Sequence, residues 1–405
     1  MRRTLIVVVA AIAVVAAVHA VRSPREHGVH RGGGSLRTLP RQTSPLEWPT
    51  YGFDVARSHA VPYDLAPPFR IAWKQVGDWS LIEFPPVVAA GRLFVGTNHG
   101  LLLALDAVTG HIVWQRKLGR CIASSPAVAG QSIVVGVLAA PPQCDRDVPS
   151  YVAAFDMRTG RTVWRNRSGP VEASPLVVGR TVIVGSWDGR LRAFDAATGA
   201  LRWSFDTDGA IKAGAVLAGG RVIVGSYDGS LYAVDAHTGV LRWSTAVGAR
   251  FYATPTVTGD RVINATTDGV VRAFDTSSGA EVWSRSIGRF AYSAAAVAGG
   301  RAYVGSYDHQ LYALDVRTGG ILWTHRAPGP ISGAPTVLGR LVYFSSCGSC
   351  SSYESNRDAR RTFAVDAVTG RLEWSFPDGE YSPVVSDGVR VYLTGYTAVY
   401  GLVPR

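Results

Sequence analysis

The chain has 405 residues, of which 47% are hydrophobic and 18% charged, and its formal net charge is +11. A charged fraction below the roughly 25% of ordinary globular domains excludes a long charge-rich disordered region and predicts a large packed core. The positive charges are spread along the chain without a block of like charges, so we expect no nucleic-acid partner.

Residues 1–21 are predicted to be an export signal. Two arginines precede an uninterrupted apolar stretch, and Ala20 ends a sequence typical of signal-peptide cleavage sites. We expect cleavage after Ala20; an uncleaved membrane anchor is the alternative, because the stretch is about long enough to span a bilayer. Both predictions place the rest of the chain outside the cytoplasm, either secreted or anchored on the outer side of the cytoplasmic membrane. Residues 22–45, rich in Pro, Gly and Arg, are predicted to be a flexible linker.

A repeat occupies most of the remaining sequence. Seven Ala-x-Asp-x-x-Thr/Ser-Gly frames occur, and a Trp follows each Asp eight positions later. The aspartates are Asp106, Asp156, Asp195, Asp235, Asp275, Asp315 and Asp366. The tryptophans are Trp114, Trp164, Trp203, Trp243, Trp283, Trp323 and Trp374. From Trp203 to Trp323 the spacing is a constant 40 residues, and short strands repeating at such a period are typical of β-propeller blades.

One repeat shows why four strands are predicted in each blade. Two runs of β-branched and aromatic residues flank an Asp228-Gly229 turn, which indicates a hairpin. The frame from Asp235 to Gly239 predicts a second tight turn, because Asp caps its own backbone and Gly tolerates a positive φ. The central strands are apolar on both faces, so neighbouring blades must cover each sheet. The recurrent Trp is interpreted as a structural wedge between adjacent blades.

Residues 46–405 are therefore predicted to form one all-β domain, an eight-bladed β-propeller of four-stranded antiparallel blades. Seven units are complete, whereas residues 381–402 supply only three strands of an eighth blade. The sequence Phe69-Arg-Ile-Ala-Trp73 matches an outer strand, so we expect this N-terminal strand to complete the last blade and close the ring. Trp73 is then the eighth repeat Trp, and we expect a monomer.

The seven frames, together with Trp48-Pro-Thr-Tyr-Gly-Phe-Asp-Val-Ala-Arg57, resemble the pyrroloquinoline-quinone (PQQ)-like propeller superfamily, which includes quinoprotein alcohol dehydrogenases and BamB-like propellers. The dehydrogenases of that superfamily carry two adjacent cysteines, acidic and Asn calcium ligands and a catalytic Asp. This sequence has no Cys-Cys pair, and its first insertion offers only Asp145 and Asp147. The resemblance therefore implies a non-enzymatic scaffold without cofactor or metal that binds a protein or small ligand. A reduced quinoprotein-like oxidoreductase using PQQ with calcium is the alternative.

Candidate binding residues are predicted at the mouth of the central channel. Two insertions, residues 137–150 and 345–361, follow the second strand of their blades and so share one face with the connections between blades. Aligning the starts of the innermost strands gives one register on that face: Glu83, Ala123, Glu172, Lys212, Tyr252, Tyr292, Ser332 and Glu380. The polar members of this register are predicted to bind a ligand or partner; a solvated channel rim is the alternative.

The same face gathers aromatic residues and arginines, which are typical of protein-interface anchors. They are Trp187, Tyr227, Tyr307, Phe251 and Phe290, with Arg120, Arg250 and Arg289 nearby in sequence. The alternative is that these rings only cover the ends of neighbouring blades.

The four cysteines are predicted to form two disulfides, Cys121–Cys144 and Cys347–Cys350. An exported chain with an even number of cysteines favours oxidation. Cys121 enters the second blade on the face that bears the insertion with Cys144, and Cys347 and Cys350 can close a local pair. A four-Cys zinc site is the alternative, and it requires the two insertions to meet above the channel.

Overall fold

A computed structural model describes residues 45–77, 84–139, 144, 150–288, 290–348, 350, 356–381 and 384–405. All of them belong to one compact unit, Leu39–Arg405. The predicted export signal lies outside the described residues, and so does the predicted linker except for residue 45. Within the described ranges, no helix is long and apolar enough to cross a membrane.

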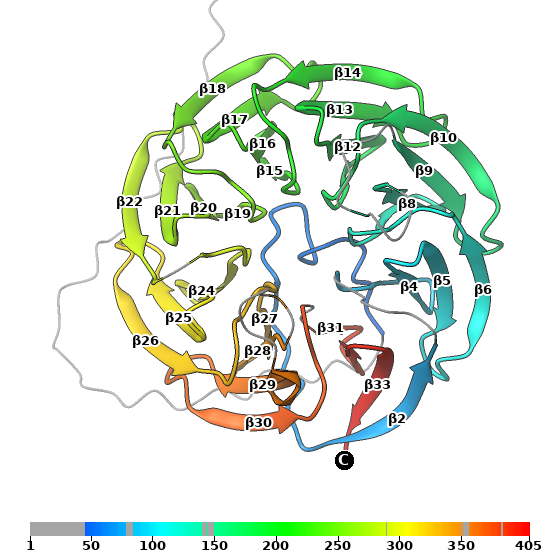
Figure 1. Ribbon diagram of the computed structural model, residues 1–405, viewed down its shortest axis with the longest axis vertical. Helices are drawn as coiled ribbons and strands as arrows, with labels where there is room; N and C mark the ends of the chain where they lie inside the picture. The colour runs from blue at the N-terminus through cyan, green and yellow to red at the C-terminus, as the bar shows by residue number, and fades with distance from the viewer. Residues whose placement is uncertain are drawn as a thin grey trace, which may run out of the picture. The chain divides into compact units, whose positions relative to one another are not determined.

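The described strands form a ring of eight sheets around a central channel (Figure 1), which confirms the predicted eight-bladed propeller. Blade 1 contains β3 (Val87–Ala89), β4 (Arg92–Gly96), β5 (Leu101–Asp106) and β6 (Ile112–Lys117). Blade 2 contains β7 (Ala127–Ala129), β8 (Ser132–Gly136), β9 (Ser150–Asp156) and β10 (Thr162–Ser168). Blade 3 contains β11 (Leu176–Val178), β12 (Thr181–Gly185), β13 (Arg190–Asp195) and β14 (Leu201–Asp206). Blade 4 contains β15 (Val216–Ala218), β16 (Arg221–Gly225), β17 (Ser230–Asp235) and β18 (Leu241–Ala246).

The second half of the ring repeats this order from the channel outward. Blade 5 contains β19 (Thr256–Thr258), β20 (Arg261–Ala265), β21 (Val270–Asp275) and β22 (Glu281–Ser286). Blade 6 contains β23 (Ala296–Ala298), β24 (Arg301–Gly305), β25 (Gln310–Asp315) and β26 (Ile321–Arg326). Blade 7 contains β27 (Thr336–Leu338), β28 (Leu341–Ser346), β29 (Arg361–Asp366) and β30 (Leu372–Phe376), with the 3-10 helix η1 (Arg357–Ala359) in its insertion. Blade 8 contains β31 (Val385–Ser386), β32 (Val391–Thr394), β33 (Ala398–Pro404) and β2 (Phe69–Val76).

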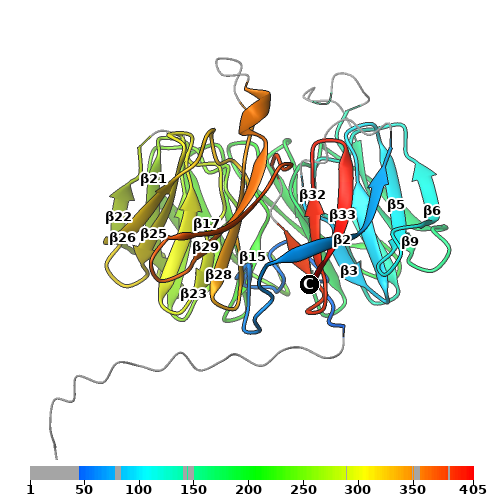
Figure 2. The same cartoon turned by 90° about the horizontal axis from the view of Figure 1, so that it is seen from below.

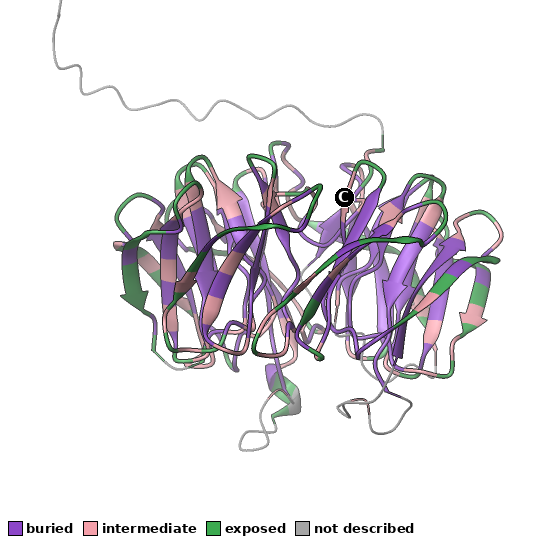
Figure 3. Ribbon diagram, turned by 90° about the horizontal axis from the view of Figure 1, so that it is seen from above, coloured by how far each residue is buried: buried purple, intermediate pink, exposed green. Residues whose placement is uncertain are grey.

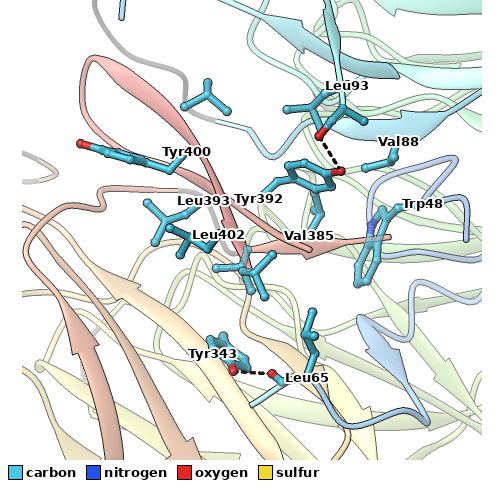
Figure 4. Packing of buried hydrophobic residues seen from close by; sticks show 14 of the residues in the cluster. Trp48, Leu65, Val88, Leu93, Tyr343, Val385, Tyr392, Leu393, Tyr400 and Leu402 are labelled. Carbon is cyan, nitrogen blue, oxygen red and sulfur yellow. Dashed lines mark hydrogen bonds between the residues drawn. The ribbon is translucent and has the colours of Figure 1, made fainter. Parts of the chain in front are cut away.

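The ring closes in blade 8 as predicted. Strand β2 pairs antiparallel with β33, and Trp73 lies opposite Gly401. The largest hydrophobic cluster joins blades 7, 8 and 1 to the chain before β2 (Figure 4). Within it the buried Tyr343 hydroxyl donates a 2.8 Å hydrogen bond to the Leu65 carbonyl. This closure removes a free sheet edge and buries apolar surface from both ends of the chain.

The repeat frame forms the joint between neighbouring blades. The indole of Trp203, for example, donates a 3.1 Å hydrogen bond to the carbonyl of Ala236, which follows the frame Asp235 of the next blade. The same ring covers Gly239, whose φ is 71° and where a Cβ would lie 2.7 Å from the indole. Only Gly fits both demands. Corresponding Trp-to-carbonyl bonds are made by Trp73, Trp114, Trp164, Trp243, Trp283 and Trp323.

Burial follows the position of each strand within its blade (Figure 3). In blade 4, Val222 to Gly225 of the second strand are all buried. In the outer strand β18, Trp243 is buried while its neighbours on both sides are exposed. The repeat Trp is thus the residue through which the outer strand reaches the core, as the sequence predicts.

An N-terminal segment, residues 46–61, lies inside the ring and was not predicted there (Figures 1 and 2). We call it the plug. Its backbone bonds to the innermost strands of successive blades: Leu217 N donates to Val55 O and Val257 N donates to Ala56 O, both at 2.8 Å. Corresponding bonds reach Val88, Val128, Val297, Val337 and Asp387. The last plug residues form β1 (Ala60–Val61), which pairs in parallel with β27.

Arg57 connects the plug to blade 3, which the backbone bonds above do not reach, and adds a contact beside blade 4. Its side chain is fully buried and donates to the carbonyls of Pro175 at 2.9 Å and Ala215 at 3.2 Å, and also to the Tyr51 carbonyl. Burial lowers the pKa of Arg57 to about 10, so the guanidinium is still charged at neutral pH. The plug therefore contacts all eight blades and closes the end of the channel opposite η1 (Figure 2).

Candidate functional site

Besides Ala123, five described members of the predicted register occupy equivalent positions in their blades. Glu172, Lys212, Tyr252, Tyr292 and Ser332 each stand four residues ahead of the innermost strand of their blade. They lie on the connections that enter the channel on the face bearing the insertions. Ala123 occupies the same position but is buried beside Cys121 and Leu138. Glu83 lies outside the described residues.

A cavity of about 260 Å³ lies between these connections and the plug. Tyr51 comes from the plug, and Tyr227 and Tyr307 come from the turns that follow the second strands of blades 4 and 6. The described residues that line it are Tyr51, Phe84, Pro85, Tyr227, Tyr252, Tyr292, Tyr307, Ser332, Gly333, Ala334 and Tyr381. We call it the tyrosine pocket. Aromatic faces and hydroxyl groups make up most of its wall.

The tyrosines pack against one another around an arc of the ring. The ring centroids of Tyr252 and Tyr292 are 4.9 Å apart, and those of Tyr292 and Tyr307 are 5.0 Å apart. The Tyr307 hydroxyl donates a 3.2 Å hydrogen bond to Ser332 Oγ. Burial raises the pKa values of Tyr227 and Tyr292, so both hydroxyls keep their protons at neutral pH. Each can therefore donate as well as accept a hydrogen bond.

A buried ionic network supports the pocket from behind. The Tyr252 hydroxyl donates to the carboxylate of Glu172, which also accepts a 3.1 Å bond from Trp187 Nε1. Lys212 Nζ lies 3.9 Å from the same carboxylate and 3.8 Å from the Trp187 ring centroid. Burial raises the pKa of Glu172, and Lys212, Tyr252 and Trp187 each oppose that rise. These groups orient Tyr252 but do not themselves line the pocket.

The eighth member of the register differs from the prediction. Glu380 is 1% exposed, and its carboxylate contacts Cys347 Sγ at 3.2 Å and Arg360 Nε at 3.0 Å. Pairing of Val385 with Tyr392 sets the start of the innermost strand, and four residues before it stands Tyr381, which lines the pocket. Blade 8 has one residue more in this connection than the sequence alignment allows. Glu380 therefore contacts Cys347 and Arg360 and does not line the cavity.

The remaining predicted residues of this face differ in burial and in the groups that they contact. Phe251 is fully buried between blades, whereas Phe290 is 50% exposed and stacks on Tyr292. Arg250 lies over the Tyr227 ring, 5.6 Å from its centroid. Arg120 lines a second, basic cavity. Arg289, Asp145 and Asp147 lie outside the described residues.

Both predicted disulfides are present. Cys121 bonds to Cys144 and Cys347 to Cys350, with Cα atoms 5.7 Å apart in each pair. The four sulfurs are therefore paired in two separate disulfides, and the four-Cys zinc alternative does not form. The first disulfide ties the entry of blade 2 to its insertion, beside Phe84 and Trp187.

Three aromatic residues of the pocket were not predicted from the sequence: Tyr51, Phe84 and Tyr381. Counting back from the second strand of blade 8, whose residue Tyr392 pairs with Val385, would have selected Tyr381. Phe84 directly follows the predicted Glu83, so including the next residue of the register would have selected it. Tyr51 carries no repeat signal, because the plug has no counterpart in the other blades.

Comparisons with known proteins agree with the fold. The chain is 30% identical over 142 residues to outer membrane protein assembly factor BamB of Bordetella pertussis, covering 35% of this chain and 34% of that protein. It is 26% identical over 252 residues to the dehydrogenase subunit of a quinone-dependent alcohol dehydrogenase from Acetobacter aceti, covering 51% and 31%. The matches thus span about a third of the length of these relatives.

Solved structures show the same architecture at low sequence identity. BamB from Moraxella catarrhalis aligns with a TM-score of 0.67 at 18% identity, over 83% of this chain and 100% of that chain. A quinohemoprotein alcohol dehydrogenase from Pseudomonas putida aligns with a TM-score of 0.74 at 14% identity, over 88% and 80%. The family model described as outer membrane protein assembly factor BamB matches residues 69–204, 187–289 and 267–402. These matches run through the whole ring from β2 to β33, and the chain belongs to this family of PQQ-like propellers.

Proposed function

We propose that this protein is an exported, non-enzymatic binding propeller that holds a small uncharged ligand in the tyrosine pocket. The observation that carries the proposal is the lining: six tyrosines surround the cavity, and no described lining residue is charged. A concave aromatic site with a few convergent polar groups is the usual form of a small-molecule site. The plug closes the opposite end of the channel, so a ligand enters from the face with the insertions.

The chemistry of the wall favours a ring with an apolar face and a hydroxylated edge, such as a pyranose sugar. Tyrosine offers an apolar ring surface and a hydroxyl tip in one side chain. Aromatic faces also attract organic cations. However, the chain carries a net charge of +11, and Lys212 Nζ lies 5.1 Å from the Tyr227 ring centroid, so a cation is repelled. A volume of about 260 Å³ restricts the ligand to one or two rings.

The described residues of the pocket do not fit PQQ with calcium. PQQ carries several carboxylates, which need cationic or strongly donating partners, and calcium needs acidic or carbonyl oxygen ligands. No described lining residue is acidic or basic. The carboxylate of Glu172, which bonds to the lining residue Tyr252, is also engaged by Trp187 and Lys212. This mismatch supports binding over quinone-dependent oxidation.

A protein partner is the second candidate, because the family is named for outer membrane protein assembly. The exposed Phe290 stacks on Tyr292 at the edge of the pocket and offers an aromatic anchor there. A partner that inserted one side chain into the pocket would use the same tyrosines. Export places either ligand outside the cytoplasm and is supported by the predicted signal at residues 1–21.

Calorimetric titration of the protein without its predicted signal tests the proposal. The probes are methyl glucopyranoside, methyl galactopyranoside, tetramethylammonium, and PQQ with calcium. We expect saturable one-site binding of a glycoside, weakened about tenfold in Tyr292→Phe by loss of one hydrogen bond. Tyr232→Phe is the matched control, because that hydroxyl bonds to Asp228 in an outer part of blade 4. Stoichiometric binding of PQQ with calcium, or no binding of any glycoside, would refute the proposal.

A further inference from the structure

The face of the propeller that carries the plug, opposite η1, has an exposed apolar edge (Figure 2). The turns between first and second strands lie on this face, since Gly339 N in blade 7 donates a 3.1 Å bond to the plug carbonyl Val61 O. The frame turns lie beside them, and Ala236 N donates to Gly220 O at 3.0 Å. The outer strands of blades 1 to 7 start directly after these frame turns. Their first residues therefore form the outer edge of the plug face.

Each blade exposes a large aliphatic side chain at this edge. Six blades do so two residues before the repeat Trp, with side chains that are 42–58% exposed: Ile71, Ile112, Leu201, Leu241, Ile321 and Leu372. The other two blades place Val163 and Val282 directly before the Trp. We call these eight residues the apolar girdle. Among the described residues, most other exposed large apolar side chains lie in or beside the same turns, and the exceptions are Val55, Val76 and Phe290.

A β-bulge at the start of each outer strand exposes the girdle residue. In blade 4, Trp243 pairs with Ala233 whereas Leu241 pairs with Val234, so one extra residue stands between them. Paired residues share a face of the sheet, and consecutive residues of a strand point to opposite faces. Leu241 and Trp243 therefore lie on opposite faces, and only the Trp is buried. The same shift of register occurs in the outer strands of all eight blades.

The girdle is a regular feature of the ring and not a scatter of single side chains. An aliphatic side chain that stays about half exposed forgoes much of the free energy that its burial would supply. Single exposed aliphatic residues are common on protein surfaces, whereas exposed apolar side chains gathered in one place mark interaction sites. Here the exposure recurs at one edge in every blade.

Several charged groups beside the girdle are paired with one another. The frame carboxylate of Asp235 accepts a 2.8 Å bond from Arg242, the extra residue of the bulge in blade 4. Arg202 bonds to Asp195 in the same way in blade 3. Such pairing lowers the cost of bringing this edge towards a less polar medium.

We propose that the apolar girdle docks the plug face onto the surface of a lipid bilayer. A flat surface can contact all eight girdle residues at once, whereas a globular protein would reach those of a few adjacent blades. The chain also enters the propeller on this face, because Leu46 N donates a 2.7 Å bond to Asp387 O in the first turn of blade 8. The apolar residues of the predicted export signal or anchor, 1–21, precede that point in sequence. Contact of this kind grows with the apolar area that enters the interface.

A second copy of the chain fits the girdle less well. Each copy has a net charge of +11, so two copies repel each other, whereas the same charge attracts an anionic bilayer. Two opposed plug faces would also have to make room for two N-terminal segments. Docking on a bilayer directs the tyrosine pocket, on the opposite face, away from the lipid. This inference does not depend on whether that pocket binds a glycoside.

Flotation with vesicles of phosphatidylcholine, with and without phosphatidylglycerol, tests the proposal. The chain that begins at residue 21 keeps the folded unit Leu39–Arg405 and lacks most of the apolar stretch. We expect it to bind both kinds of vesicle, more strongly with the anionic lipid. The triple variant Leu201→Ser, Leu241→Ser, Ile321→Ser should have a vesicle partition coefficient about tenfold lower or less. No binding to either vesicle, or equal binding by the triple variant, would overturn the proposal.

Two single variants show which face docks. Leu201 and Val76 are 58% and 56% exposed and lie near opposite ends of outer strands. We expect Leu201→Ser to weaken vesicle binding about threefold and Val76→Ser to leave it unchanged, with melting temperatures showing that both variants fold. Equal losses would contradict docking through the plug face. Self-association without vesicles that disappears in the triple variant, measured by sedimentation, would assign the girdle to a second copy instead.

Discussion

The two ends of the channel are built by different means. At the end closed by the plug, backbone hydrogen bonds join residues 46–61 to seven blades, and Arg57 bonds to three further carbonyls of the inner wall. At the other end the tyrosine pocket is formed by side chains such as Tyr252 and Tyr292, at positions that the repeat does not specify. The first end can stabilise the ring, whereas the second can recognise a ligand. Substitutions at the two ends should therefore affect different properties.

Removal of the N-terminal residues should have the largest effect. A chain that begins at residue 78 lacks both the plug and β2, so it exposes the edge of β33 and the cluster around Tyr343. We expect its melting temperature to fall by more than about 10 °C relative to a chain that begins at residue 45. A chain that begins at residue 62 keeps β2 and separates the two contributions. Equal melting temperatures for all three chains would contradict the structural role of this end.

Loss of the Arg57 side chain should have the next largest effect. Arg57→Met removes the donors to the buried carbonyls of Pro175, Ala215 and Tyr51, although Pro175 keeps a 3.4 Å hydrogen bond from Thr50 Oγ1. We expect the free energy of unfolding to fall by about 3 kcal/mol in chemical denaturation. Lys212→Met at the other end is the comparison, because its amine is partly exposed and Glu172 can accept a proton. A larger loss of unfolding free energy for Lys212→Met than for Arg57→Met would contradict the stabilising role of the plug end.

His59 should make the plug sensitive to acid. Burial, with Arg57 adding repulsion, lowers the pKa of His59 from its ordinary value of 6.5 to about 3. Between these values the unfolded chain binds a proton that the folded chain does not. Stability from this group is therefore complete above pH 6.5 and is lost as the pH falls towards 3, by about 1.4 kcal/mol per pH unit.

Denaturation curves at pH 7, 6 and 5 measure this dependence. His59→Asn removes the titrating group and suits the backbone, because the φ of residue 59 is 51° and Asn tolerates that region. We expect a flatter pH dependence for the variant than for the wild-type protein. Parallel curves would show that His59 is already accessible to protons in the folded state.

The smallest effect on stability is expected at the mouth. Tyr292→Ala truncates a half-buried ring that packs on other tyrosines, and we expect the free energy of unfolding to change by no more than about 1 kcal/mol. The same variant should lose glycoside binding in calorimetry, because it removes both the ring face and the hydroxyl. A variant that melts much earlier yet still binds would show that Tyr292 belongs to the core and not to the site.

The ring could be predicted from the sequence, because each repeat contains the residues that form its turn and its bond to the next blade. The frame Asp and Gly define a turn, and the Trp eight positions later bonds to the next blade, so seven frames and Trp73 predict eight joined blades. Both disulfides followed from their places in the loops. The joint between blades 7 and 8 departs from this pattern: Trp374 packs on Phe69, at 5.4 Å between ring centroids.

The site was only partly predictable, since it depends on what the repeat does not encode. A connection one residue longer in blade 8 exchanges Glu380 for Tyr381, and periodicity cannot reveal such a shift. The plug follows no period, because its backbone groups, and not a pattern of side chains, select its partners. Tyr51 reaches the pocket only as a consequence of that path.

A crystal structure of the protein soaked with the tightest-binding glycoside shows whether the tyrosine pocket is the binding site. We expect ligand density within the tyrosine pocket, in contact with Tyr252 and Tyr292, and an unchanged plug at the other end of the channel. Ligand density on the plug face or against the insertions, with the pocket empty, would contradict it.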